Sequence, residues 1–553
     1  MPVDVPTLLT SLRTGRLDME SLGAFPEQDP ADRAVGDEWV AQAETFMRRQ
    51  VDPDDIDSTR ELPAGLIDAL RREGFLTAAF RTEKKAALSP YNVLRLVTAM
   101  ATWSVPVAQV VAVHAGVGAG ALDPVLPDGP LRELVRDRIG NGVLSGFADT
   151  DPAGQNNRLP RMTATRTGDG SAVLLHGEKL YTANGPVAGL LAVSAVLDGQ
   201  VCVCFVDTAS PGFSVESTIE FIGSKGLPSG ALRFDGVRVP ANRVLSGVDG
   251  QLRLPPALNS VAFLGRIYLA GGPAIAIVRN CLAWSRDFVN RRRVDDRPLG
   301  DYSRIQRMVA ATMADAYAVD SVARWCLVGS GLADRWLERF VAKNVLTRTA
   351  WHAADRTVSL LGAEGVETAA SKRRRGAVAL PVERALRDSR VLRTAGNVDF
   401  RLDSQVAQLI LAGTHGEGPA VDRVDLGRSA TGLSLRNQVH LGAVAEQVRW
   451  FAKLCAQTRD TDAVTSGADE HLLVTVGRIA AELVTASVVL SRTAQLDTAE
   501  AQDLADVHCT AARHRLTGLW RKLEPDDEPD YRTISRGWLA GSAFEFLGGR
   551  HGR

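Results

Sequence analysis

The spacing of apolar residues changes twice along this chain of 553 residues, and these changes limit the folds that it can adopt. Between residues 37 and 135, apolar side chains recur at helical spacing, as at Trp39 and Ala43. Between residues 142 and 245, short runs of β-branched and apolar residues alternate with Asp-Gly turn signals. After Pro256 helical spacing returns and continues almost to the end. The sequence therefore predicts an α+β multidomain protein.

The changes in spacing also give expected domain boundaries. At roughly 150 residues per domain, a chain of this length holds about three or four domains. We expect an N-terminal extension (1–36), an N-terminal helical domain (37–141), a central β-barrel-like domain (142–250), a C-terminal four-helix bundle (251–418) and an additional helical domain (419–553).

Charge and composition exclude several classes of function. The 64 basic and 65 acidic residues give a net charge of −1, which argues against nucleic-acid binding. Cys202 and Cys204 are the one close cysteine pair, so neither a zinc site nor a disulfide framework is predicted. The N-terminus shows no signal-peptide pattern. The apolar window 105–122 is interrupted by Gln109 and His114 and indicates a buried helix. We expect a cytoplasmic protein with no metal site, no nucleic-acid partner and no integral membrane segment.

Five short motifs follow one another through the β region. They are Thr150-Asp151-Pro152-Ala153-Gly154-Gln155-Asn156, Gly177-Glu178-Lys179-Leu180-Tyr181-Thr182-Ala183-Asn184, Pro211-Gly212-Phe213, Ile222-Gly223-Ser224-Lys225-Gly226 and Phe234-Asp235-Gly236-Val237-Arg238-Val239-Pro240. In this order they resemble the motifs of the acyl-CoA dehydrogenase family of FAD-dependent flavoproteins, whose first two read T-E-P-x-A-G-S-D and G-x-K-x-W-I-T-N. The resemblance covers about residues 37 to 413 and marks a divergent member with a C-terminal helical extension.

The resemblance implies a reaction and a cofactor. In the family, a carboxylate removes the α-proton of an acyl thioester while the β-carbon delivers a hydride to FAD, and both events need one fixed geometry. The flavin is clasped between the β domain and the bundle, and its adenosine end lies at a subunit interface. The resemblance therefore implies FAD, a small-molecule substrate that is an acyl thioester of CoA or of a carrier protein, and a homodimer or homotetramer.

Position by position, the resemblance also names site residues. Contacts with FAD would come from Phe147, Thr150, Tyr181, Thr182, Ala183, Arg292, Gln306 and Gly362, and contacts with the substrate from Gln155, Asn156 and Arg266. Arg292 would reach the pyrophosphate of the neighbouring subunit's FAD, since the planar fork of a guanidinium suits phosphate oxygens. Ala183 stands where the family usually places a threonine.

The catalytic base is missing at both positions where the family keeps it. Most members carry it as the Glu of Y-E-G-T, shortly after an R-D-A motif. Here ungapped alignment puts Gly396 at that position, and a one-residue gap puts Ala395 there. The second location lies in E-R-x-x-x-A-G-G-P, where this chain has Gly265. None of these residues accepts a proton, so the catalytic residues stay unknown. Asp399 is a weak candidate, and further candidates are Asp149, His415 and Glu417.

Four readings of the function follow. The first is an FAD-dependent oxidoreductase that carries out α,β-dehydrogenation of an acyl thioester with a non-standard or missing base. The second is a monooxygenase or oxidase on the same fold, whose flavin another protein reduces, since the chain has no G-x-G-x-x-G fingerprint. The third is a flavoprotein with another reaction, non-redox chemistry included, on a specialised metabolite. The fourth is a non-catalytic structural or interaction relative. The extension after residue 418 is expected to pack against the bundle or a partner subunit.

Overall fold

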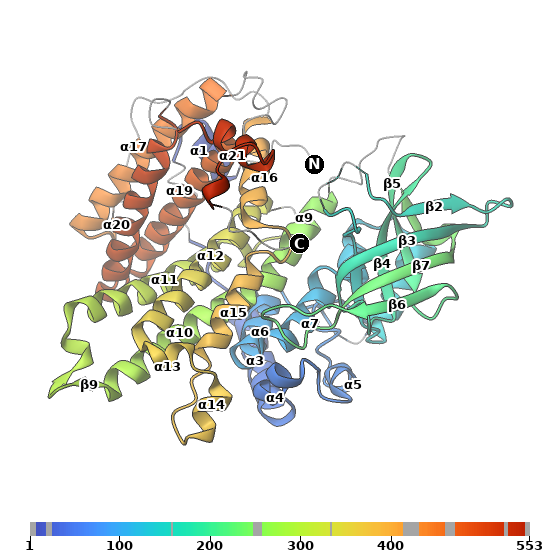
Figure 1. Ribbon diagram of the computed structural model, residues 1–553, viewed down its shortest axis with the longest axis horizontal. Coiled ribbons are helices and arrows are strands. Elements are labelled where there is room, and N and C mark those ends of the chain that lie inside the picture. Colours follow the sequence, from blue (N-terminus) through green and yellow to red (C-terminus); the bar gives the residue numbers. More distant parts are fainter. Residues whose placement is uncertain are drawn as a thin grey trace.

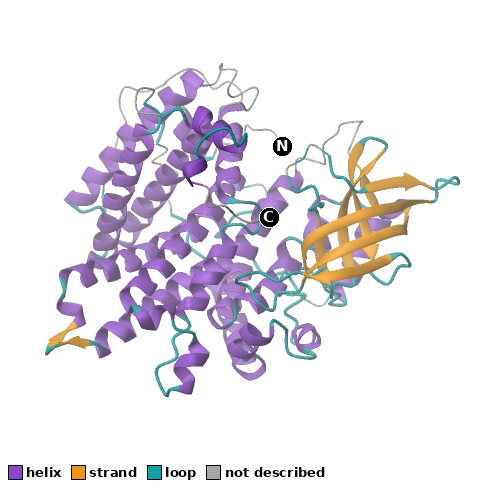
Figure 2. Cartoon of the chain, in the orientation of Figure 1, coloured by secondary structure: helices purple, strands orange, loops and turns teal. Residues whose placement is uncertain are grey.

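A helical body carries one β domain at its side, as the computed structural model shows (Figures 1 and 2). The structure describes residues 7–17, 25–83, 85–155, 157, 159–246, 257–331, 334–412, 431–458, 470–524 and 529–547. Helices precede the β domain along the chain, and a longer set of helices follows it. This order confirms the predicted α+β fold class.

Capping residues start several of the N-terminal helices. The helical elements are α3 (Pro30–Gln50), α4 (Pro53–Thr59), α5 (Leu66–Arg72), α6 (Pro90–Trp103), α7 (Val105–Gly116), η1 (Ala119–Val125) and α8 (Pro130–Gly140). The carboxylates of Asp29 and Asp52 accept backbone N–H groups of the first turn, each just before a proline. Because Asp29 caps α3, that helix begins at Pro30 and not near residue 37, where the helical domain was expected to begin.

The β domain is one mixed sheet with a core on each face. Its strands are β1 (Ser145–Ala148), β2 (Thr163–Arg166), β3 (Ala172–Ala183), β4 (Leu190–Leu197), β5 (Gln200–Asp207), β6 (Phe213–Thr218), β7 (Ser229–Pro240) and β8 (Val244–Ser246), with the 3-10 turn η2 (Ala241–Arg243) before β8. The order is β6-β7-β3-β2-β4-β5-β8, and β1 pairs with β4 in parallel. Alternate side chains, such as Leu191 and Ala192, enter different apolar clusters. One cluster lies within the domain, and the other packs against η1 and α8.

The bundle begins beside the β domain and runs away from it (Figure 1). Its elements are α9 (Ala257–Arg266), a π-helical turn η3 (Ile267–Gly271), α10 (Gly272–Arg291), the hairpin β9 (Arg293–Val294) and β10 (Arg297–Pro298), η4 (Leu299–Asp301), α11 (Ser303–Leu327), α12 (Trp336–Leu361), α13 (Ala363–Val366), α14 (Ala369–Arg374) and α15 (Val382–Leu392). Helices α10, α11, α12 and α15 pack on one another as the predicted four-helix bundle. A π-turn such as η3 often marks a functional site.

The added helices continue the bundle. They follow α16 (Asp399–Ala412), the last helix before residue 418, and are α17 (Leu435–Thr458), α19 (Glu470–Leu496), α20 (Ala499–Arg521), α21 (Tyr531–Leu539) and η6 (Glu545–Leu547). Helix α19 crosses α16 so closely that a Cβ on Gly477 would overlap the carbonyl oxygen of Asp403, and α20 packs along α11. The extension thus packs against the bundle of its own chain, as the sequence predicted.

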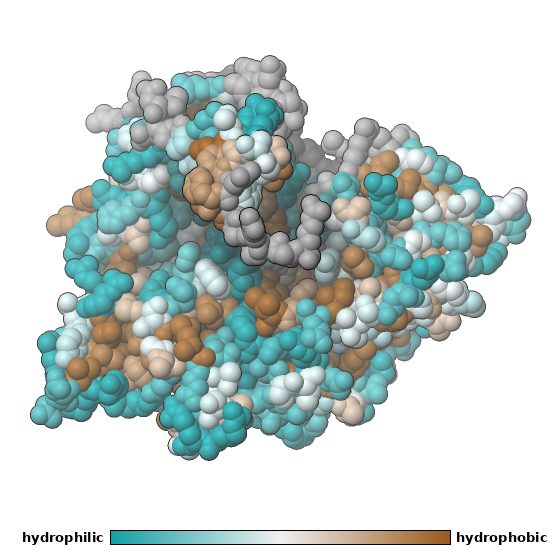
Figure 3. All heavy atoms as spheres, viewed as in Figure 1, coloured by the Kyte–Doolittle hydropathy of each residue, from teal (hydrophilic) through white to brown (hydrophobic). Residues whose placement is uncertain are grey.

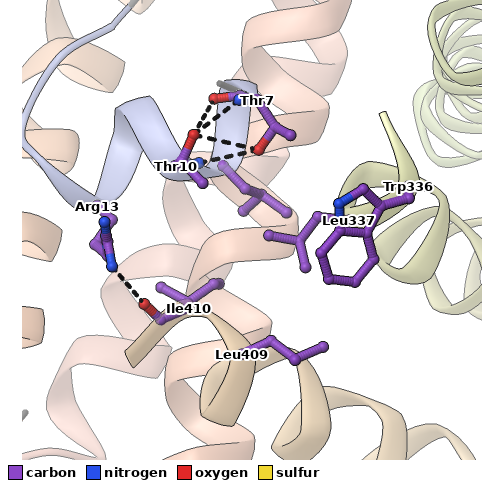
Figure 4. A pocket seen from close by; sticks show the side chains of 8 residues that line it. Thr7, Thr10, Arg13, Trp336, Leu337, Leu409 and Ile410 are labelled. Atoms are coloured by element: carbon purple, nitrogen blue, oxygen red, sulfur yellow. Dashed lines mark hydrogen bonds between the residues drawn. The ribbon is translucent and has the colours of Figure 1, made fainter. Parts of the chain in front are cut away.

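A short N-terminal helix, α1 (Leu8–Arg13), is bound where the bundle meets the added helices (Figure 4). Thr7 and Thr10 form a reciprocal capping box at its start. The Leu9 N–H donates to the carboxylate of Glu338 on α12 at 3.0 Å. Arg13 donates to the carbonyl of Ile410 on α16 at 3.3 Å. Residues far apart in the sequence are therefore joined at one point.

Three helical stretches are long and apolar enough to cross a membrane. They are Val105–Val125, Leu258–Arg291 and Glu470–Leu496, and between 78% and 89% of their most apolar windows is buried inside the protein. These apolar stretches therefore form part of the core of this fold.

Candidate functional site

The candidate site lies between the β domain and the helical body, where α9 passes between the two (Figure 1). The space-filling view shows this face of the molecule hollowed between the same two parts (Figure 3). The α15–α16 turn and α9 form the helical side of the site. The ends of β1 and β3 form the other side.

Gly396 lies in the turn between α15 and α16 with a φ of 70°, a left-handed conformation that favours glycine. Its carbonyl oxygen accepts a hydrogen bond from Nε of Arg266 at 2.7 Å. A Cβ at this position would lie 2.9 Å from Cγ of Arg266. The stem of Arg266 therefore occupies the space that a side chain at the family's base position would enter. The neighbouring Ala395 donates its N–H to the carbonyl of Val391 and ends the last turn of α15.

Lys343, on α12, holds the same turn. Its side chain is fully buried on α12, and Nζ donates to the carbonyl oxygens of Arg393 at 3.0 Å and Asn397 at 2.9 Å. Burial lowers the pKa of the Lys343 ammonium to about 7. The two hydrogen bonds fix the turn on both sides of Gly396.

Arg266 rests on an aromatic surface. The rings of Phe263 and Phe340 are stacked with centroids 4.2 Å apart, and the guanidinium lies 5.3 Å from the first and 5.9 Å from the second. Burial lowers the pKa of Arg266 to about 10, and the more distant charge of Asp149 opposes this shift. Among the residues that the structure describes, no carboxylate lies within ion-pair distance of Arg266.

Gly265, at the second family position for the base, is enclosed by backbone. A Cβ placed on Gly116 of α7 would lie 2.7 Å from Cα of Gly265, and a Cβ on Gly265 would overlap the Gly116 carbonyl oxygen. Gly265 also borders a cavity of about 280 Å³ that Phe80 and Tyr268 help to line, whereas Arg266 and Gly396 are not among its lining residues. Glycine is thus required here by the crossing of α7 and α9.

Of the candidate acids, Asp399 is held by two arginines. Its carboxylate accepts hydrogen bonds from Arg393 at 2.6 Å and Arg348 at 3.2 Å. Burial acts to raise the pKa of Asp399, but these two guanidinium groups outweigh it and hold the pKa below its usual value. A carboxylate stabilised in this way is a weak base. His415 and Glu417 lie outside the described residues.

Asp149 is exposed at the end of β1 and makes no ion pair within the described part of the chain. Its carboxylate accepts hydrogen bonds from the Ser194 hydroxyl at 2.8 Å and from the Gln155 amide at 3.1 Å. The exposed Gln155 therefore lies beside an exposed acid, while Asn156 is outside the described residues.

A buried ion pair connects the first sequence motif, at Asp151, with the second, at Lys179. Nζ of Lys179 donates to the carboxylate of Asp151 at 2.7 Å and to the Asp149 carbonyl at 2.8 Å, and both charged side chains are almost fully buried. The Leu180 N–H donates to the carbonyl of Thr150 at 2.7 Å. These contacts place the half-buried Thr150 next to β3.

The end of β3 fits a planar heterocycle with a polar edge. The hydroxyl oxygens of Thr182 and Ser229 are buried and have no hydrogen-bond partner among the described residues. Ser229 pairs in register with the half-buried Ala183, so these two side chains share one face of the sheet, whereas the buried Thr182 points to the other face at the same end. Such hydroxyls require a partner, and the N–H and C=O groups of a flavin ring can supply one. Tyr181 is 56% exposed, with a left-handed φ of 56° that turns it out of the strand.

Ser229 was missed by the sequence reasoning, because an unpartnered hydroxyl leaves no mark in a sequence. Phe147, a predicted FAD contact, is half-buried on β1 and packs against the cluster formed with η1 and α8.

Three predicted FAD contacts lie elsewhere. Arg292 is exposed at the end of α10, next to the hairpin β9, and the exposed Gln306 donates to the carbonyl of Gly300 at 3.0 Å. Figure 1 shows β9 at the end of the bundle remote from the β domain. Gly362 is exposed at the end of α12 with a φ of 61°. A single chain therefore does not bring these residues to β3.

Two protein-family models match the chain. The model "Acyl-CoA dehydrogenase, middle domain" matches residues 146–237, and "Acyl-CoA dehydrogenase, C-terminal domain" matches residues 262–398. The second match includes both positions at which the resemblance expects a base, so their glycines stand inside recognisable family sequence.

Similar proteins cover most of the chain. A probable acyl-CoA dehydrogenase, FadE10, of Mycobacterium tuberculosis is 26% identical over 82% of this chain and 69% of its own. Benzylmalonyl-CoA dehydrogenase of Aromatoleum aromaticum is 25% identical over 69% of this chain and 98% of its own. The crystal structure of an acyl-CoA dehydrogenase complexed with FAD from Bacillus anthracis superposes with a TM-score of 0.77, at 18% identity, over 96% of this chain and 94% of that one. That last likeness extends over the added C-terminal helices.

Proposed function

The chain belongs to the acyl-CoA dehydrogenase family by its middle and C-terminal domains, and from that premise we propose that it is an FAD-dependent oxidoreductase that oxidises an acyl thioester without a base at the family's position. The observation that carries the finer part of this proposal is the contact between Gly396 and Arg266. Where the family has a carboxylate, this chain presents a backbone carbonyl capped by a guanidinium.

FAD supplies the two-electron oxidant when it is bound. The chain's own residues hold and orient it. The hydroxyl of Ser229, on the face of Ala183, would meet the polar edge of the ring, and the exposed Tyr181 would pack beside it. The exposed Arg292 and Gln306 would hold the FAD of a partner subunit, and on this proposal a homodimer is the smallest complete unit.

Asp149 is the group that we assign to the α-proton. It is exposed, makes no ion pair within the described residues and is near enough to interact electrostatically with Arg266. Asp399 lacks these properties because Arg348 and Arg393 hold its carboxylate. The hydrogen bonds from Ser194 and Gln155 orient the Asp149 carboxylate and leave its remaining lone pairs free.

The first experiment is anaerobic titration of the purified, flavin-loaded protein with a panel of acyl-CoAs, followed by its visible spectrum. Bleaching by an acyl-CoA supports the proposal. A flavin that bleaches only with an external reductant favours a monooxygenase or oxidase, a reading that the absent base also favours. A colourless protein that cannot be reconstituted with FAD contradicts both.

A matched pair of variants tests the assignment of the proton. Asp149→Asn is expected to slow bleaching by an acyl-CoA about 10²- to 10⁴-fold, the usual contribution of a general base, with FAD still bound. Asp399→Asn removes the negative charge that pairs with Arg393. We expect it to lower the free energy of unfolding while an acyl-CoA still bleaches the flavin. Equal bleaching by Asp149→Asn and the wild type would exclude Asp149.

A further inference from the structure

Arg266 differs from Arg324 and Arg291, which also lie on aromatic rings, because those two arginines pair with carboxylates. Two further arginines on rings, Arg297 and Arg335, bond backbone carbonyls through their terminal amino groups. Arg324 lies over Tyr91 and pairs with the carboxylate of Asp320 at 2.9 Å. Arg291 lies over Phe288 and pairs with Glu364 at 2.7 Å. Arg266 has a similar ring contact, yet its hydrogen bond goes to the neutral carbonyl of Gly396.

A half-buried guanidinium without a counter-ion is unfavourable, because charges removed from water need an opposite charge or a full set of hydrogen-bond acceptors. Only Nε of Arg266 has a hydrogen-bond partner in the described part of the chain, so the terminal amino groups remain for a ligand. Asp149 acts electrostatically on Arg266, but lies beyond ion-pair distance and accepts hydrogen bonds from Ser194 and Gln155.

The guanidinium is also held in place. The stacked rings of Phe263 and Phe340 support one face, and the carbonyl of Gly396 fixes Nε at 2.7 Å. Lys343 in turn fixes the residues on both sides of Gly396. A pre-positioned fork of N–H donors matches the two oxygens of a carboxylate better than any other common group on an acyl chain.

We propose that Arg266 binds a carboxylate carried by the acyl group of the substrate, so that this enzyme takes thioesters of dicarboxylic acids. The proposal rests on the proposed function, which supplies the acyl thioester. Because the stem of Arg266 fills the place of the family's base, the bound carboxylate lies close to the reacting carbons. A monocarboxylic acyl group would leave the guanidinium without its counter-ion, which penalises that substrate.

The test is a comparison of matched thioesters by calorimetric binding to the flavin-loaded protein under anaerobic conditions. The pairs are methylmalonyl-CoA with isobutyryl-CoA and succinyl-CoA with butyryl-CoA, in each of which a carboxylate replaces a methyl group. We expect the carboxylated member to bind about 10- to 100-fold more tightly, the usual range for a hydrogen bond to a charged group. The pair with the larger ratio tells whether the carboxylate sits on the α-carbon or further along.

Variants assign the preference to this residue. Arg266→Met keeps an apolar side chain on Phe263 and Phe340 and is expected to abolish the preference, while Arg266→Lys keeps part of it. The matched control is Arg335→Met, because Arg335 also lies over an aromatic ring, that of Trp325, and bonds a backbone carbonyl outside the cleft. This control is expected to keep the full preference.

Equal affinity of the wild type for both members of each pair would overturn the proposal, whether or not the Arg266 variants fold. A preference that survives in a folded Arg266→Met variant would also overturn it. Failure of the proposed function looks different: the carboxylated thioesters would bind in an Arg266-dependent way but no acyl-CoA would bleach the flavin. Bleaching by isobutyryl-CoA and methylmalonyl-CoA with equal affinities would leave the oxidoreductase and refute the carboxylate site.

Discussion

Two glycines stand where related enzymes carry a catalytic base, and the structure gives them different explanations. Gly265 lies against the backbone of Gly116, so no side chain fits without separating α7 from α9. Gly396 lies in a turn with a left-handed φ of 70°, where a side chain would strain the backbone and meet the stem of Arg266, but no backbone of another helix. The first glycine is required by helix packing, whereas the second leaves room that Arg266 has taken. Glycine is therefore needed for helix packing at position 265, whereas at position 396 it marks a change in the chemistry of the site.

The comparison predicts that a carboxylate can be restored at only one of the two positions. Gly396→Glu introduces an acid against Arg266, and we expect it to raise flavin reduction by a monocarboxylic acyl-CoA about 10²- to 10⁴-fold. The introduced carboxylate also satisfies Arg266, so the preference for carboxylated thioesters should disappear. Anaerobic stopped-flow reduction and calorimetric binding measure the two effects. Gly396→Gln is the uncharged control, and an equal gain from it would show that charge is not the cause.

At the other position we expect a loss of stability. Gly265→Ala forces a methyl group into the backbone of α7, and overpacking of this kind costs about 1–3 kcal/mol of unfolding free energy or more. Urea denaturation measures the change. Gly442→Ala in α17 is the matched control, since a Cβ there meets nothing within 4 Å and alanine favours a helix over glycine by about 0.5–1 kcal/mol. Equal stabilities of the two variants would refute the closed α7–α9 crossing.

Substitution of Lys343 tests whether its buried ammonium group holds the turn at Gly396. Its pKa of about 7 in the folded protein is lower than the ordinary lysine value of 10.5, so the unfolded chain binds more protons between these values. Wild-type stability should therefore gain from this group as pH rises from about 7 to about 10.5, by at most about 1.4 kcal/mol per pH unit. Lys343→Met should lack this gain, as measured by denaturation at several pH values. Parallel pH profiles of variant and wild type would contradict the burial of the ammonium group.

A smaller effect of pH on stability, of the opposite sign, is expected from Asp388 in α15. Asp388 is buried and accepts the Ser224 N–H at 2.6 Å, and burial raises its pKa to about 6. The folded protein then binds more protons between about pH 4 and pH 6, so this group makes the wild type less stable as pH rises through that window. Asp388→Asn keeps an acceptor for Ser224 without the charge. Its stability relative to the wild type should rise over the same two pH units, and a constant difference would contradict the shifted pKa.

The sequence foretold much of the fold, because periodicity and capping are local. Helical spacing from residue 37 onward predicted the N-terminal helices, yet α3 begins at Pro30 because the cap at Asp29 was not taken into account. The motifs from Thr150 to Pro240 predicted the β domain, and the structure joins the first two through Lys179 and Asp151. Their order along the chain was enough to indicate the family.

The sequence predicted only part of the candidate site. Alignment located Gly396 and Gly265 as empty positions, and Arg266 as a substrate contact, without showing that Arg266 and Gly396 touch. Asp399 was a weak candidate for a displaced base, and the structure shows that Arg348 and Arg393 hold its carboxylate. These contacts join residues that are distant in sequence, and no local pattern records them.

By itself the sequence determined the order of domains, the family and the absence of an acid at Ala395, Gly396 and Gly265, because each of these is a property of neighbouring residues. Tertiary structure alone decided what fills the missing acid's place. Arg266 and Gly396 are 130 positions apart, and only the packing of α9 against the α15–α16 turn brings a guanidinium to that carbonyl. Short-range preferences set the elements, whereas the chemistry of the cleft depends on how those elements are packed together.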